Sequence, residues 1–189
     1  MSDQNTRFLI PDLQVRGQVV KLQHSYQSVL ANAEDPPPVA RVLGEALAAV
    51  GALGSILKLR GSIIMQLQGD GPLHTLVVQA NNAGELRGLA RGFEELEEDE
   101  SLGQLLGRGK LVITIDGEGS RRYQGIVALE GNTLSEVLER YFHQSEQLKT
   151  HLHLAADAER AACFLLQQLP GSPDEETGQN WQHAKILGE

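Results

Sequence analysis

Apolar and polar residues alternate along several short stretches of the chain, as they do in β-strands with one buried face. The clearest stretch is 123–129, where Val127 and Leu129 alternate with Ala128 and the following Glu130. Successive strand residues point to opposite faces of a sheet, so this period of two predicts a half-buried strand. Further strands are predicted at 8–22 (one or two strands, with Gly17 at a bend or bulge), 63–67, 73–79, 86–93, 110–115, 152–154 and 164–169.

Other segments repeat their apolar residues at the spacing of a helix. Residues 39–57 are apolar nearly all round beyond Ala46, which predicts a central buried helix opened by Pro38. An amphipathic helix is predicted at 134–147, where Thr133 and Glu136 fit a capping box. A shorter helix is expected at 26–33. Another is expected within 94–106, with its start in the acidic residues of that segment.

Glycine-rich and asparagine-rich turns separate the predicted strands, at 69–71, 81–84 and 116–119. Such turns between alternating stretches are typical of antiparallel hairpins. Strands interleaved with a few helices, without regular βαβ alternation, favour the α+β class. We therefore expect a largely antiparallel sheet with a central buried helix and several packing helices.

The chain is long enough for a single hydrophobic core, with 189 residues of which 41% are hydrophobic. Leu169-Pro170-Gly171 is expected to end a folding domain of residues 1–170, followed by a linker or tail segment, 171–189, that either docks on the body or stays loose. The longest apolar stretch, 46–57, is too short to cross a bilayer.

Two further features bear on the cellular compartment. The amino-terminal residues lack the basic and apolar regions of a secretory signal. A lone cysteine, Cys163, excludes an internal disulfide framework. Together these features favour a cytoplasmic protein that does not associate with membranes.

Charge argues against nucleic acid as a partner, because the net charge is −9 and a polyanion would be repelled. Six of the acids lie in the run 94–100. We interpret this run as the solvated start of a helix, where acids face the positive end of the helix dipole. The alternative is a docking site for basic partners, which would make the protein a structural interaction module.

The candidate chemistry is sparse. His151 and His153 stand two apart in a predicted strand, so both rings face one way and could hold zinc if Asp157 or Cys163 completed the site. We interpret them instead as the polar face of an edge strand. Cys163 precedes an apolar run, where a thiol keeps a high pKa and packs as a small hydrophobe.

No other pattern indicates catalysis. Residues 107–110 lack the spacing of a phosphate-binding loop, and no serine stands in a nucleophile elbow. The chain is therefore expected not to be an enzyme, and a metal-dependent enzyme built on the histidine pair remains the alternative.

Five blocks of sequence carry a family resemblance. They are LQVRGQVV (13–20), LQGDGPL (67–73), RGLAR (87–91), VITI (112–115) and the whole segment 122–148. In this order they resemble the heat-shock protein 33 (Hsp33) family of bacterial redox-regulated holdase chaperones. The resemblance runs along most of 8–170, which corresponds to the amino-terminal domain of that family.

The resemblance implies an ATP-independent, stress-protective chaperone that binds unfolding polypeptides. Family members end in a zinc module with four cysteines, whose oxidation releases the metal, forms disulfides, unfolds a linker and favours dimers. This sequence has one cysteine, so we expect no cofactor here and zinc only in a carboxy-terminal module that is missing from these residues.

The tail supplies the candidate contact residues. Trp181, Ile186 and Leu187 are apolar residues in a polar segment. We expect them to cover their own domain, to swap onto a second copy in a homodimer, or to contact clients.

Overall fold

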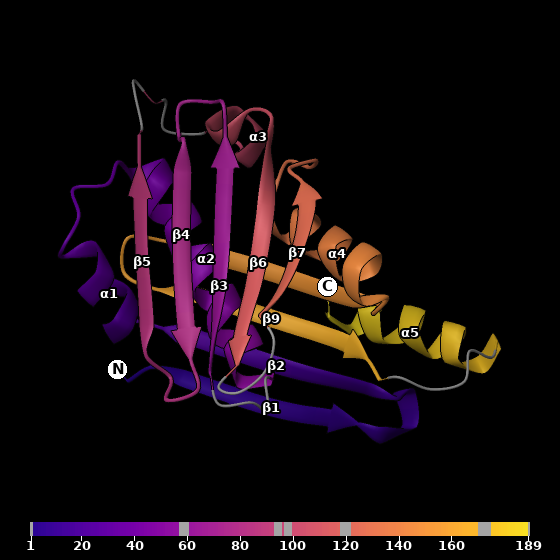
Figure 1. The fold of residues 1–189 in the computed structure, drawn as a ribbon. Helices are drawn as coiled ribbons and strands as arrows, with labels where there is room; N and C mark the ends of the chain where they lie inside the picture. The colour runs from indigo at the N-terminus through magenta and orange to yellow at the C-terminus, as the bar shows by residue number, and fades with distance from the viewer. Residues whose placement is uncertain are drawn as a thin grey trace.

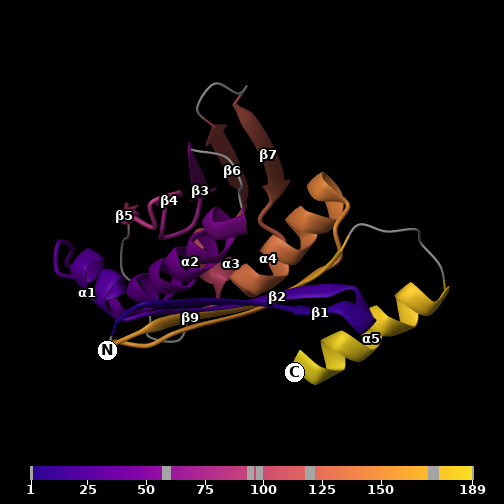
Figure 2. The same ribbon diagram turned by 90° about the horizontal axis from the view of Figure 1, so that it is seen from below.

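The computed structural model describes residues 2–56, 61–92, 96, 100–117, 122–169 and 175–188, and shows two antiparallel sheets with a long helix between them (Figures 1 and 2). One sheet has the order β5 (Leu86–Arg91), β4 (Thr75–Asn81), β3 (Gly61–Gly69), β6 (Gly109–Gly117) and β7 (Tyr123–Ala128). The other has the order β1 (Gln4–Ile10), β2 (Val15–Leu22), β9 (Ala161–Gln168) and β8 (Thr150–Ala156). The helices are α1 (His24–Leu30), α2 (Pro37–Ile56), α3 (Leu102–Leu106), α4 (Leu134–Tyr141) and α5 (Glu175–Gly188), with a 3₁₀ turn η1 (Pro11–Leu13) and a π-helical turn η2 (Phe142–Glu146).

The predicted α+β class is confirmed, and so is the central buried helix. Figure 2 shows α2 lying between the two sheets, and its residues 46–50 are fully buried. A helix that is apolar all round can bury every face only by packing against structure on several sides. Within the part of the chain described, no helix has the length and apolarity needed to span a membrane.

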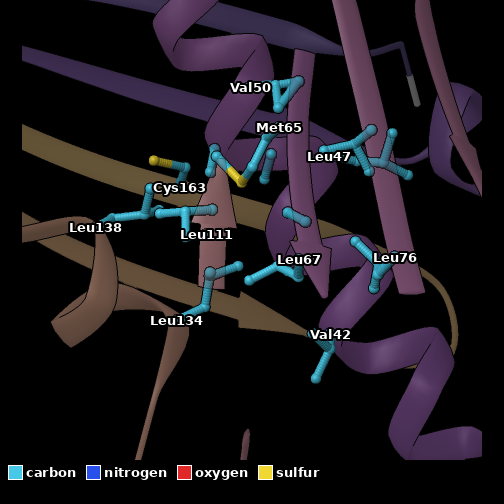
Figure 3. Packing of buried hydrophobic residues seen from close by; sticks show 14 of the residues in the cluster. Val42, Leu47, Val50, Met65, Leu67, Leu76, Leu111, Leu134, Leu138 and Cys163 are labelled. Atoms are coloured by element: carbon cyan, nitrogen blue, oxygen red, sulfur yellow. The ribbon is translucent and has the colours of Figure 1, made fainter. Parts of the chain in front are cut away.

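The hydrophobic core joins both sheets to α2 and α4. Figure 3 shows Met65 and Leu67 of β3 near Leu47 of α2, with Leu138 of α4 and Cys163 of β9 close by. All five side chains are at most 1% exposed. Because one cluster spans all the layers, the sheets and α2 form one packed unit.

The four-stranded sheet depends on a pairing between distant parts of the sequence. β2 lies between β1 and β9, and its Val19 pairs with Phe164. The register of β2 continues unbroken through Gly17, so the expected bend or bulge is wrong. Gly17 serves a packing role instead, since a Cβ there would lie 2.1 Å from Cζ of Phe8.

Helix starts follow the predicted capping chemistry only in part. Thr133 Oγ1 accepts a hydrogen bond from the Glu136 amide at 3.2 Å, but the Glu136 carboxylate accepts from the amide of Asn132, one residue before the expected partner. The helix is also shorter than predicted, because α4 gives way to η2 after Tyr141.

The acidic run does not supply the first turn of α3. α3 begins at Leu102, and Ser101 and Gln104 form a complete capping box. The two described residues of the run, Leu96 and Glu100, lie outside any helix. The rest of the run lies outside the described residues, and so do two of the four residues of the predicted turn at 116–119.

Candidate functional site

The four-stranded sheet carries apolar side chains on both faces. Val20 and Leu165 belong to the core around α2, whereas Val15 and Leu166 lie on the opposite, outer face in a cluster of their own. Val15 is 0% exposed and Leu166 is 2% exposed. Another part of the chain therefore covers these residues of the outer face.

The cover is α5, which lies on the side of the sheet away from α2 (Figure 2). Trp181 and Ala184 of α5 complete the cluster with Val15 and Leu166. Gly188 allows a close approach at the other end of the helix, because a Cβ there would lie 3.0 Å from Cδ1 of Leu166. We call this set of apolar residues on the outer face the outer-face site. It includes a row of three rings, Phe8, Phe164 and His153.

An aromatic row extends the outer-face site across the sheet, and its Phe8 and Phe164 pack against the cluster that contains Trp181. Phe8 of β1 stacks on Phe164 of β9, with ring centroids 6.3 Å apart and planes at 22°. His153 of β8 stacks on the same Phe164 ring at 6.3 Å. Phe8 and Phe164 are partly exposed and His153 is exposed. Rings of this kind offer large apolar contact area at small entropic cost.

The three predicted contact residues of the tail have different environments. Trp181 is 7% exposed and faces the sheet, whereas Ile186 is 67% exposed. The side chain of Leu187 lies outside the described residues. Trp181 also lines a groove of about 390 Å³ between α4, β8 and α5. Trp181 and Ile186 therefore do not form one exposed patch.

The histidine pair lies on one face of an edge strand, as predicted, with ring centroids 4.6 Å apart. His151 is nevertheless buried, and its Nδ1 lies 2.8 Å from Oε1 of Glu139 on α4. The same carboxylate oxygen accepts a hydrogen bond from the Leu152 amide at 2.9 Å. Glu139 thus joins α4 to the edge of β8.

The residues that were to complete a zinc site are not brought to the histidines. Asp157 accepts the amides of Glu159 and Arg160 in the turn after β8. Cys163 belongs to the inner core cluster, on the opposite face of the sheet. Among the described residues, no group of three or more histidines, cysteines, aspartates and glutamates is placed to hold a metal ion.

Cys163 is buried, as its apolar neighbours predict. It is 1% exposed, and burial raises the pKa of its thiol to about 12. The thiolate is the reactive form of cysteine, so this side chain is chemically quiet in the folded protein.

Sequence reasoning missed the outer-face site as a site. The signal was present in 163–166, where four apolar residues stand in a row rather than alternating with polar ones. A continuous apolar strand is typical of burial on both faces. The partner strand and the covering helix could not be read from that pattern.

These features define a two-sheet α+β domain whose outer sheet face is apolar and lies under a carboxy-terminal helix. The family model described as "Hsp33 protein" matches residues 3–188, and the chain belongs to the Hsp33 family. This confirms the family resemblance identified from the five sequence blocks.

Curated relatives agree along nearly the whole chain. It is 46% identical over 181 residues to the 33 kDa chaperonin of Shewanella loihica, covering 96% of this chain and 63% of the relative. It is 45% identical over 193 residues to the 33 kDa chaperonin of Ectopseudomonas mendocina, covering 100% of this chain and 65% of the relative. The chain thus spans less than two thirds of the length of either relative.

A solved structure has the same fold. The crystal structure of the 33 kDa chaperonin of Thermotoga maritima matches with a TM-score of 0.79 at 20% identity, covering 95% of this chain and 65% of that one. Identity this low supports the fold alone.

Proposed function

We propose that this domain is an ATP-independent holdase, which binds partly unfolded polypeptides under heat or oxidative stress and keeps them from aggregating. The observation that carries the proposal is the outer-face site, an apolar sheet face under a helix of whose described side chains only Trp181 and Ala184 are buried. Exposed apolar surface is what captures a partly folded chain before it meets another. The name chaperonin in the relatives supports the same function.

α5 is suited to leave the sheet. Of its described side chains, Trp181 and Ala184 are the two that are buried, and a long hydrogen bond of 3.4 Å joins Asn180 to the carbonyl of Asp12. A terminal helix held by few contacts opens at low free-energy cost. Its release would uncover Val15 and Leu166 for a client.

The released helix is itself a contact surface in this proposal. Trp181, Ile186 and Leu187 would then meet a client or dock on the sheet of a second copy, giving a domain-swapped homodimer. The tail 171–189 would act as a separable segment beside a chaperone domain of residues 1–170. Partners are unfolding proteins, without nucleic acid or membrane.

The proposed activity has no chemical step and uses no cofactor within these residues. The family resemblance assigns zinc to four paired cysteines, and one buried thiol does not fit such a site. No step of the proposal therefore goes through zinc, and we expect these residues to act without a redox switch. A chain with one cysteine needs no oxidising compartment, which supports the cytoplasm.

The test is suppression of light scattering from a heat-denatured enzyme, without nucleotide. The wild-type chain in molar excess should suppress scattering. Phe164→Ser removes the central ring of the aromatic row, so half-maximal protection should need about three- to tenfold more protein. Leu9→Ser is the matched control, because Leu9 is 56% exposed on the same sheet and lies outside the aromatic row.

Two results would contradict the proposal. One is unchanged scattering with the wild-type chain at large excess. The other is an equal loss of protection in both variants, which would mean that the outer-face site has no particular role. Circular dichroism and melting would show that each variant is folded.

A further inference from the structure

Among the described elements of the chain, no helix lies on the outer face of the five-stranded sheet. Figure 1 views this face directly, and α2 passes behind it. Met65, Val78 and Ile113 point inward, and each is at most 1% exposed. Their neighbours along the strands point outward, to a face that no element of the described chain covers.

An apolar row crosses this outward face from one edge to the other. The strand registers place five residues side by side, namely Leu89, Val77, Gln66, Val112 and Ile126. Four of the five are apolar. The end residues are well exposed, Leu89 at 42% and Ile126 at 56%, whereas Val112 between them is 8% exposed. A large exposed apolar side chain at each end of a mostly apolar row is typical of an interaction surface rather than of a solvated sheet.

The charges beside this row are all positive. Arg87 lies in the cross-strand row on one side, and Arg91 and Lys110 lie in the row on the other. These three rows contain no acidic residue. Within the part of the chain that the structure describes, none of the three cations forms an ion pair. This local sign is the reverse of the whole chain, whose net charge is −9.

We propose that this cationic sheet face is a second docking surface, for polypeptide segments in which apolar residues are flanked by aspartate or glutamate. Leucine, isoleucine or valine side chains of the segment pack on the apolar row. Its carboxylates meet Arg87 on one side and Arg91 and Lys110 on the other. The inference rests on the proposed function only in taking a polypeptide as the partner, and it adds the class of segment selected.

Charge complementarity favours this occupant over two others. A second copy docked face to face would bring its own Arg87, Arg91 and Lys110 against the same cations, which costs free energy. A nucleic acid would meet three cations on a molecule of strongly negative net charge and would leave the apolar row unused. A segment with both apolar and acidic residues can pack on the apolar row and also pair with the cations beside it.

Direct binding tests the inference without any holdase assay. The probe is a short fluorescein-labelled peptide of alternating leucine and glutamate, followed by fluorescence anisotropy, with a leucine–lysine peptide for comparison. The acidic peptide should bind more tightly at low than at high salt, and the basic peptide should bind weakly or not at all. Ile126→Ser and Lys110→Glu should each weaken binding about fivefold or more. Leu89→Ser, at the other end of the row, should act like Ile126→Ser.

Matched controls lie on the other sheet. Leu9→Ser removes a side chain as exposed as Ile126, and Lys21→Glu reverses an exposed cation of β2. Both should leave the affinity for the acidic peptide unchanged. Equal weakening by Lys21→Glu and Lys110→Glu would overturn the inference, because the peptide would then respond to the overall charge of the protein rather than to this sheet face. A fall in solution mass on Ile126→Ser would also overturn it, since the face would then join two copies.

The two proposals fail separately. A chain that suppresses client scattering but does not bind the acidic peptide would overturn this inference and leave the holdase intact. A chain that binds the peptide through Ile126 and Lys110 but gives no protection would overturn the holdase and leave the docking surface standing.

Discussion

Glu45 is an acidic residue within the buried helix α2. It lines a groove of about 390 Å³ that also includes Arg41 and His153. Burial raises the pKa of the Glu45 carboxyl from 4.5 to about 7, and the charge of Arg41 offsets part of that rise. The folded protein therefore holds this carboxyl protonated under conditions in which an unfolded chain would have lost the proton.

The sign of the resulting pH dependence follows from this difference. Below pH 4.5 both states are protonated, and Glu45 contributes nothing to the pH dependence. Between pH 4.5 and about 7 the unfolded chain ionises first, so the free energy of unfolding falls as pH rises. Above pH 7 the loss is complete. Glu45→Gln should therefore raise the free energy of unfolding by about 1–3 kcal/mol more at pH 8 than at pH 4.5.

Urea denaturation at the two pH values measures this difference. Glu34→Gln is the control, because Glu34 is exposed and its replacement should change stability equally at both. If Glu45→Gln changes the free energy of unfolding by the same amount at pH 4.5 and at pH 8, the Glu45 carboxyl is ionised in the folded state and the interpretation is wrong.

At the scale of elements, α4 protects the free edge of β8. Glu139 does this with one carboxylate oxygen, which accepts from the Leu152 amide at 2.9 Å and lies 2.8 Å from His151 Nδ1. Unpaired backbone groups at a sheet edge invite pairing with another chain. A side chain that fills one of these positions is therefore both a stabilising contact and a barrier to aggregation.

Removal of that carboxylate should destabilise the protein. Glu139→Ala leaves the Leu152 amide without an acceptor, and we expect a loss of about 1–3 kcal/mol in the free energy of unfolding, measured with urea. Glu139→Gln keeps an acceptor oxygen and should lose less. Ser135→Ala, one turn earlier on α4, should change stability by less than about 0.5 kcal/mol. A Glu139→Ala variant as stable as wild type would show that water replaces the carboxylate.

An element could be predicted from the sequence when the residues that determine it lie close together along the chain. The hairpins of β3, β4 and β5 could be predicted because alternation and turn residues lie within one short segment. The capping by Thr133 is equally local, whereas the start of α3 was wrongly predicted in the acidic run because the local capping box of Ser101 and Gln104 was overlooked. The contact of Glu139 with Leu152 could not be predicted, because it depends on how a helix and a strand approach each other in space.

At the scale of the whole molecule, α5 should be the first part to open. Trp181 is the sole tryptophan of the chain, so its emission reports the docking of α5 alone. We expect Trp181 emission to shift to the red at lower urea than the loss of far-ultraviolet circular dichroism, because few of the described side chains of α5 are buried. If a second copy recaptures the released helix, raising the protein concentration should move this first transition to higher urea.

Trp181→Ala should release α5 without unfolding the sheets. The variant should keep the circular dichroism transition of the wild type and bind more of an apolar fluorescent dye, because Val15 and Leu166 become accessible. Coincident emission and circular dichroism transitions in the wild type would instead mean that α5 unfolds only with the body.

The division of strands between two sheets could not be predicted from the sequence. The periodicity of 164–169 indicates a strand, but nothing local indicates that β9 pairs with β2 near the other end of the chain. The contact partners of Trp181 could not be predicted for the same reason. Its apolar character predicts a contact, and the structure alone shows that the contact is with Val15 and Leu166 of this distant pair.

The pairing of Val19 with Phe164 also has a consequence for biosynthesis. As the nascent chain leaves the ribosome, β1 and β2 emerge early, but the strand that completes their sheet is made only after most of the domain. For all that time the inner edge of β2 has no neighbour. Slow translation of the segment between β2 and β9 would lengthen the interval in which this chain is itself prone to aggregate.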